Sequence, residues 1–86
     1  DFRDDNYCKE IVESENRLER LKYDGYATLV WNYLESLYDT YGNKLENTSF
    51  YGALQTLGNR HKVWLFYNDN YQDYNNELLK FLKVNN

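Results

Sequence analysis

Proline and methionine are absent from this sequence, and cysteine, histidine and glycine are scarce. The 86 residues contain one cysteine, one histidine and four glycines. So little glycine and no proline exclude a collagen-like or linker-like chain, and a lone cysteine excludes a small fold held by its own disulfides. The lack of methionine even at position 1 indicates a processed form or a fragment of a longer protein.

Long apolar runs and an excess of basic residues are also missing. The longest apolar run, Val63–Tyr67, is far shorter than the roughly 20 residues that a membrane-spanning helix needs. The formal net charge is −4, whereas nucleic-acid binding requires a concentrated basic field. We therefore expect neither a membrane span nor a nucleic-acid partner.

Few residues are available for catalysis. Cys8 and His61 lie far apart in the sequence; they could form a nucleophilic pair, but no third, orienting group can be assigned. Cys8 is otherwise a small residue at a helix edge or one half of a disulfide to a segment outside this one. A lone histidine cannot form a zinc site, and Gly52 and Gly58 lack the lysine of a phosphate-binding loop. The prediction is a protein that is not an enzyme and has no metal or cofactor.

Apolar residues recur at steps of three and four, which predicts amphipathic helices. Longer helices are expected over residues 3–21, 26–41 and 60–84, with a short helix after Thr48 or Ser49. No stretch alternates with a period of two. The fold class is therefore all-α: a single domain over residues 1–86, built as a small antiparallel bundle of three longer helices plus one short helix. The expected caps and ends are Asp4 or Asp5, Gly25, Gly42, Asn43, Gly58 and Asn59.

Aromatic residues make up 19% of the chain, ten of them tyrosines, which is more than one small core needs. Most fall on the predicted core stripes. Trp31 and Tyr38 form a shoulder beside the core face of helix 26–41, and Trp64 and Leu65 fall at the boundary and on the far side of helix 60–84. Exposed side chains of this kind mark protein-binding surfaces. The alternative is a last helix that packs on both sides. The expected core face of helix 26–41 comprises Tyr26, Val30, Tyr33, Leu34, Leu37 and Tyr41.

The tripeptide Arg60-His61-Lys62 adds basic side chains at the expected start of the last helix. Cations there oppose the helix dipole, so we expect an acidic group to compensate, either Glu46 or Asp39 of a neighbouring segment or an acidic partner; the alternative is an ordinary solvated helix start. Together these features predict a protein-binding site made of Arg60, His61, Lys62, Trp64, Leu65, Trp31 and Tyr38.

The segment from Ser49 to Tyr71, SFYGALQTLGNRHKVWLFYNDNY, resembles the helical C-terminal domains of mosquito salivary collagen-binding antiplatelet proteins, the aegyptin and anopheline antiplatelet type. The shared features are a small-residue helix ending in Leu-Gly, a basic Arg-His-Lys and then Val-Trp-Leu-Phe-Tyr. The resemblance implies a secreted, salivary protein that blocks a host protein in haemostasis, inhibiting platelet aggregation by binding collagen. Asn47-Thr48-Ser49 matches the N-glycosylation pattern, which is compatible with secretion. The alternative function is an intracellular helical adaptor or assembly domain.

Overall fold

Helices and tight turns form the part of the chain that the structure, a computed structural model, describes: residues 3–85, without the side chain of Asn68. No strand occurs within this range, which confirms the all-α prediction. The three longer helices are α1, α2 and α3; α4 and α5 are short, and two 3-10 helices, η1 and η2, join them. Their bounds are α1 Asp5–Val12, α2 Arg17–Tyr41, η1 Gly42–Asn47, α3 Tyr51–Arg60, α4 Lys62–Phe66, η2 Tyr67–Asp73 and α5 Asn76–Phe81.

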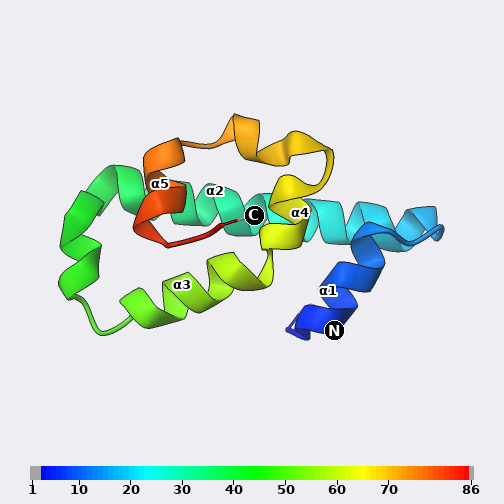
Figure 1. Ribbon diagram of the computed structural model, residues 1–86, viewed down its shortest axis with the longest axis horizontal. Coiled ribbons are helices and arrows are strands. Elements are labelled where there is room, and N and C mark those ends of the chain that lie inside the picture. The colour runs from blue at the N-terminus through cyan, green and yellow to red at the C-terminus, as the bar shows by residue number, and fades with distance from the viewer. Residues whose placement is uncertain (1–2, 86) are drawn as a thin grey trace.

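Helix α2 organises the molecule. Its 25 residues correspond to a length of about 37 Å, close to the longest dimension of the protein, 41 × 24 × 20 Å. Figure 1 shows α2 along this axis, with α3 running back antiparallel to it and α5 crossing the C-terminal half of α2 in this view. Both α3 and α5 contact α2, whereas α1 packs against α2 and α4 near the N-terminal end of α2.

The first predicted helix, residues 3–21, is wrong in extent because local side-chain bonds interrupt it. Asp4 caps α1 as expected, accepting from the backbone N–H groups of Asn6 and Tyr7. The helix ends at Val12, and the Ser14 hydroxyl then accepts from the Asn16 N–H at 3.0 Å. The Asn16 side chain caps α2 by accepting from the Glu19 N–H at 3.2 Å. Side chains of this kind compete with a continuous helical ladder, so the chain turns between α1 and α2.

The break expected at Gly25 does not occur, because α2 continues through it. A glycine inside a helix costs only about 0.5–1 kcal/mol. The buried face on both sides of Gly25, from Tyr23 and Ala27 to Trp31 and Leu34, outweighs that cost. The helix ends instead at Gly42, as predicted; its φ of 57° is in the left-handed region that favours glycine.

Gly58 is a packing residue and does not end a helix. It is buried inside α3, and a Cβ there would lie 3.3 Å from Val84 Cγ2. Asn59 likewise belongs to α3 and does not cap the following helix; its Nδ2 donates to the Gln55 carbonyl at 2.9 Å. The expected short helix is therefore one turn longer than predicted, and its start lacks a side-chain cap from Thr48 or Ser49.

The long last helix predicted over residues 60–84 is divided into α4, η2 and α5. Asn70 Nδ2 donates to the carbonyls of Trp64 and Tyr67 at 2.8 and 3.0 Å, which ends the helical ladder after α4. Asp69 turns the backbone with a φ of 59°, a conformation that aspartate tolerates better than most residues. Asn75 then caps α5 by accepting from the Glu77 N–H. The asparagine- and aspartate-rich composition of residues 68–76 thus favours turns over a continuous helix.

Candidate functional site

Cys8, Tyr23 and His61 meet in the interior, although they come from distant positions in the sequence. The Tyr23 hydroxyl and His61 Nδ1 share a hydrogen bond of 2.6 Å, and Cys8 Sγ lies 3.8 Å from the same nitrogen. Cys8 and His61 are both 0% exposed. The Trp31 indole N–H donates to the His61 carbonyl at 3.4 Å. This cluster therefore joins α1, α2 and the junction between α3 and α4.

The electrostatics of the cluster favour neutral side chains. Burial, reinforced by the charge of Arg60, lowers the pKa of His61 to about 4. Burial also raises the pKa of the Cys8 thiol and that of the Tyr23 hydroxyl. A nucleophilic Cys–His pair needs a thiolate beside a base, within reach of substrate. A neutral pair enclosed by protein matches a core contact instead, and His61 Nε2 is buried without a hydrogen-bond partner among the described residues.

The structure buries four of the seven residues predicted to bind a partner. Trp31, His61 and Leu65 are 0% exposed, and Trp64 is 7% exposed. For Trp64 and Leu65 the expectation of exposure was wrong because α1, α3 and η2 all pack around α4, which is the two-sided packing left open above. Trp31 lies on α2, and its indole N–H reaches the buried His61 carbonyl. The Trp64 indole N–H donates to Asp24 Oδ1 at 3.0 Å, so this side chain has an internal partner.

The remaining three predicted residues keep some surface. Arg60 bonds Asp5 through its Nε at 3.1 Å. It lies in the last turn of α3, where the helix dipole favours a cation, so the argument that this charge opposes a helix dipole fails. Lys62 is half-buried, and Tyr38 is half-buried with its ring 5.0 Å from that of Phe81. Whether these residues bind a partner stays a prediction.

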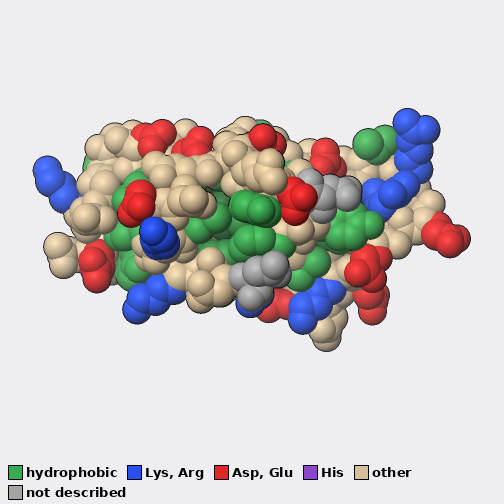
Figure 2. All heavy atoms as spheres, turned by 45° about the horizontal axis from the view of Figure 1, so that its top comes forward, with side chains coloured by type: hydrophobic (Ala, Val, Ile, Leu, Met, Phe, Trp, Pro, Cys, Tyr) green, Lys and Arg blue, Asp and Glu red, His purple; other side chains and the backbone are tan. Residues whose placement is uncertain are grey.

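An exposed groove lies between the C-terminal half of α2, η1 and the start of α3. We call it the aromatic groove; its volume is about 480 Å³. Three rings on it are about half exposed: Tyr33 by 56%, Tyr41 by 54% and Phe50 by 48%. Figure 2 shows hydrophobic side chains as a band through the middle of one face, with charged side chains mostly around it and at the ends. The groove is lined by Tyr33, Leu37, Tyr41, Lys44, Leu45, Thr48, Phe50 and Leu54.

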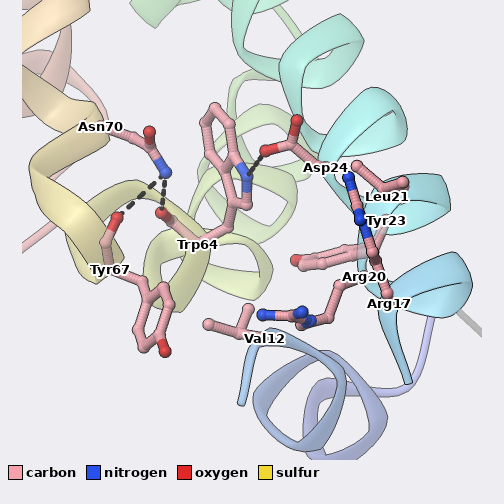
Figure 3. A pocket seen from close by; sticks show the side chains of 9 residues that line it. All are labelled: Val12, Arg17, Arg20, Leu21, Tyr23, Asp24, Trp64, Tyr67 and Asn70. Carbon is pink, nitrogen blue, oxygen red and sulfur yellow. Dashed lines mark hydrogen bonds between the residues drawn. The ribbon is translucent and has the colours of Figure 1, made fainter. Parts of the chain in front are cut away.

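A second hollow, of about 250 Å³, lies where the end of α1 and the start of α2 face α4 and η2. We call it the Trp64 pocket. Figure 3 shows the Trp64 indole bonded to Asp24 on one side, and the Asn70 amide holding the carbonyls of Trp64 and Tyr67 on the other. The pocket is lined by Val12, Arg17, Arg20, Leu21, Tyr23, Asp24, Trp64, Tyr67 and Asn70.

The aromatic groove was missed because two of its tyrosines were assigned to the core face of helix 26–41. Tyr33 and Tyr41 were placed in the core, and Trp31 beside it. With α2 starting at Arg17, the buried stripe is Tyr23, Ala27, Val30, Trp31 and Leu34. Tyr41 lies seven positions after Leu34, a spacing of two helical turns, so the sequence pattern places it on the buried stripe and does not indicate its exposure.

Comparison with known proteins adds no relative: no protein-family model, curated protein or solved structure matches this chain. None of the helices in the described part of the chain has the length and apolar character of a membrane span. In residues 3–85, no group of three metal-ligating side chains is positioned to hold an ion.

Proposed function

We propose that this protein is a secreted, non-enzymatic binding module that blocks a host protein through its aromatic groove. The observation that supports this groove as the binding site is that the rings of Tyr33, Tyr41 and Phe50, all about half exposed, line it together. Large rings of this kind supply much contact area with few rotatable bonds, and they dominate many interfaces. Burying them against a partner would remove apolar surface from water.

Collagen is the partner that we propose. The resemblance of residues 49–71 to salivary collagen-binding antiplatelet proteins supports it, and Phe50 and Leu54 of the groove lie in that segment. Collagen chains adopt a polyproline-type helix rich in proline, and aromatic-lined grooves are a recurring way to bind such segments. Blocking collagen in this way would prevent platelets from aggregating on it, which is the haemostatic role implied above.

Glycosylation of Asn47 tests the proposal that the protein is secreted. It is the last residue of η1, its side chain is exposed, and it begins the Asn-Thr-Ser sequence. Expression in secreting animal cells should attach a glycan to Asn47, visible as a mass increase that Asn47→Gln abolishes. A secreted product with no glycan would remove this support.

An intracellular adaptor remains the second candidate, and the burial of Cys8 favours it. Because the thiol is enclosed beside His61, a disulfide to another segment would require the core to open. The structure therefore does not favour the hypothesis that Cys8 forms a disulfide with a segment outside this one. Measuring whether native material contains a Cys8 disulfide separates the two functions: a disulfide favours secretion, and a reduced thiol favours the adaptor.

Binding to an immobilised triple-helical peptide of Gly-Pro-Pro repeats tests the proposed function. Tyr33→Ser combined with Phe50→Ser should weaken binding at least about tenfold, because two interface rings each contribute more than 1 kcal/mol in typical hot spots. Leu18→Ser is the matched control: it also removes an exposed apolar side chain from α2 but lies about 22 Å along the helix from Tyr33. Circular dichroism checks that each variant folds.

Two results would overturn this proposal. If wild-type protein does not bind the triple-helical peptide or fibrillar collagen, collagen is not the partner. If the double variant and Leu18→Ser bind equally well, the aromatic groove is not the contact surface. Arg60→Ala with Lys62→Ala tests the surface predicted from the sequence, and we expect this variant to bind as well as wild-type protein does.

A further inference from the structure

The Trp64 pocket combines apolar walls with two arginines. Arg17 and Arg20 both line it, and neither forms an ion pair with another described residue. In Figure 3 the Arg20 guanidinium points into the space between Val12, Tyr23 and Tyr67, and Arg17 extends along the α2 side. These two cations and the apolar walls define the chemistry that this pocket offers.

The walls of the pocket are held in place before any ligand arrives. The bond from the Trp64 N–H to Asp24 Oδ1 fixes the indole against α2. Asn70 bonds the carbonyls of Trp64 and Tyr67 together, which fixes the start of η2 beside α4. A hollow whose walls are already ordered loses little conformational entropy on binding.

The charges around the pocket favour an anion. Arg17 and Arg20 contribute two positive charges, and Asp24 contributes one negative charge that is engaged by the Trp64 N–H. Glu19, which lies between the arginines in sequence, accepts from the Tyr7 hydroxyl at 2.9 Å. The net charge of the lining is therefore positive, and guanidinium groups bind carboxylates through paired hydrogen bonds.

We infer that the Trp64 pocket binds an apolar carboxylate, with the acid group on Arg20, the positive charge of Arg17 on the same wall, and the apolar group against Val12, Leu21, Trp64 and Tyr67. The volume of about 250 Å³ is slightly below the roughly 300–1,000 Å³ of drug-sized sites, so the pocket suits one ring system. Such a group could come from a free aromatic acid or from the C-terminal residue of a peptide. This inference does not depend on the proposed function, because the pocket and the aromatic groove share no lining residue.

Calorimetric titration with two pairs of probes tests the inference and identifies the source. The first pair is indole-3-acetate and its neutral amide; the second is an acetylated Gly-Gly-Trp peptide with a free or an amidated C-terminus. We expect each free acid that binds to do so with a Kd of about 1 mM or tighter, and its amide to bind at least about tenfold more weakly. If only indole-3-acetate binds, the ligand is a small free acid. If the peptide with a free C-terminus binds more tightly, the ligand is the C-terminal residue of a peptide.

Charge variants give the second measurement. Arg17→Gln with Arg20→Gln should weaken binding of the free acid at least about tenfold, whereas Lys22→Gln, an exposed cation of α2 outside the pocket, should leave it unchanged. The Trp64 indole N–H resonance should shift on binding in wild-type protein.

If neither acid binds, if acid and amide bind equally, or if both arginine substitutions leave the affinity unchanged, the inference is wrong. The acid–amide comparison uses wild-type protein, so it decides even if a variant fails to fold.

Discussion

Lowering the pH from 7 to 4 should weaken the folded state through His61, the only histidine in the sequence. Burial, together with the nearby charge of Arg60, lowers its pKa from 6.5 to about 4, and Asp5 opposes this with a smaller effect. In the unfolded chain the imidazole should titrate at about 6.5. The folded state therefore keeps His61 neutral over a pH range in which the unfolded state has already bound a proton.

The sign and size of the effect follow from this difference. Above about pH 6.5 the imidazole is neutral in both states, and its full contribution to stability is present. As the pH falls, proton uptake stabilises the unfolded state until the folded state is also protonated, near pH 4. The free energy of unfolding should fall by about 3 kcal/mol over this range. A domain of this length has a total stability of about 4–13 kcal/mol, so the loss is a large fraction.

Urea unfolding, followed by circular dichroism at several pH values, measures this loss. Carboxylates titrate in the lower part of the range, so wild type is compared with His61→Gln, which lacks the imidazole. The free energy of unfolding of wild type minus that of His61→Gln should decrease as the pH is lowered, by at most about 1.4 kcal/mol per pH unit. Proton NMR of the His61 ring provides the direct pKa. A ring pKa near 6.5, or curves for the two proteins that run parallel between pH 6.5 and 4, would refute the reasoning.

Three further predictions concern stability and can be measured as shifts in thermal unfolding. Gly25→Ala should stabilise the protein by about 0.5–1 kcal/mol, because a Cβ there meets no atom within 4 Å; Gly58→Ala should instead be neutral or destabilising, since its nearest neighbour is 3.3 Å away. Leu65→Ala should cost about 2–5 kcal/mol and Leu29→Ala, which is 69% exposed, less than about 0.5 kcal/mol; equal costs would show that α4 is misplaced. Asn16→Ala should cost about 1 kcal/mol through loss of the α2 cap, and an unchanged midpoint would mean that α2 starts elsewhere.

The fold class and several helix ends could be predicted from the sequence, because they depend on neighbouring residues. Helical spacing of apolar residues indicated an all-α protein, Asp4 was one of the two expected caps of the first helix, and Gly42 was correctly placed as a helix end. Gly25 was mispredicted because its local preference was weighed without the tertiary contacts, and the last helix was mispredicted because the local turn preference of its asparagines was not weighed. Burial on both sides of Gly25 overrides its cost, whereas Asn70 and Asn75 bond backbone groups and interrupt the last helix.

The candidate sites depend on contacts between distant residues, which spacing does not reveal. Cys8 and His61 are 53 positions apart, and nothing near either one indicates that they meet. Trp31 was placed beside the core when it is in the core, where its indole N–H bonds the carbonyl of His61, 30 positions away, a contact that helical spacing does not reveal. The Trp64 pocket likewise needs residues from α1, α2, α4 and η2.

The central claim is that partner binding uses the aromatic groove, while the residues around His61 form the core. Amide and side-chain NMR shifts on addition of the triple-helical Gly-Pro-Pro peptide test it most directly. We expect shifts at Tyr33, Tyr41 and Phe50, with little change at His61 and Leu65. Shifts concentrated at residues 60–65, with the resonances of the groove unchanged, would contradict the account.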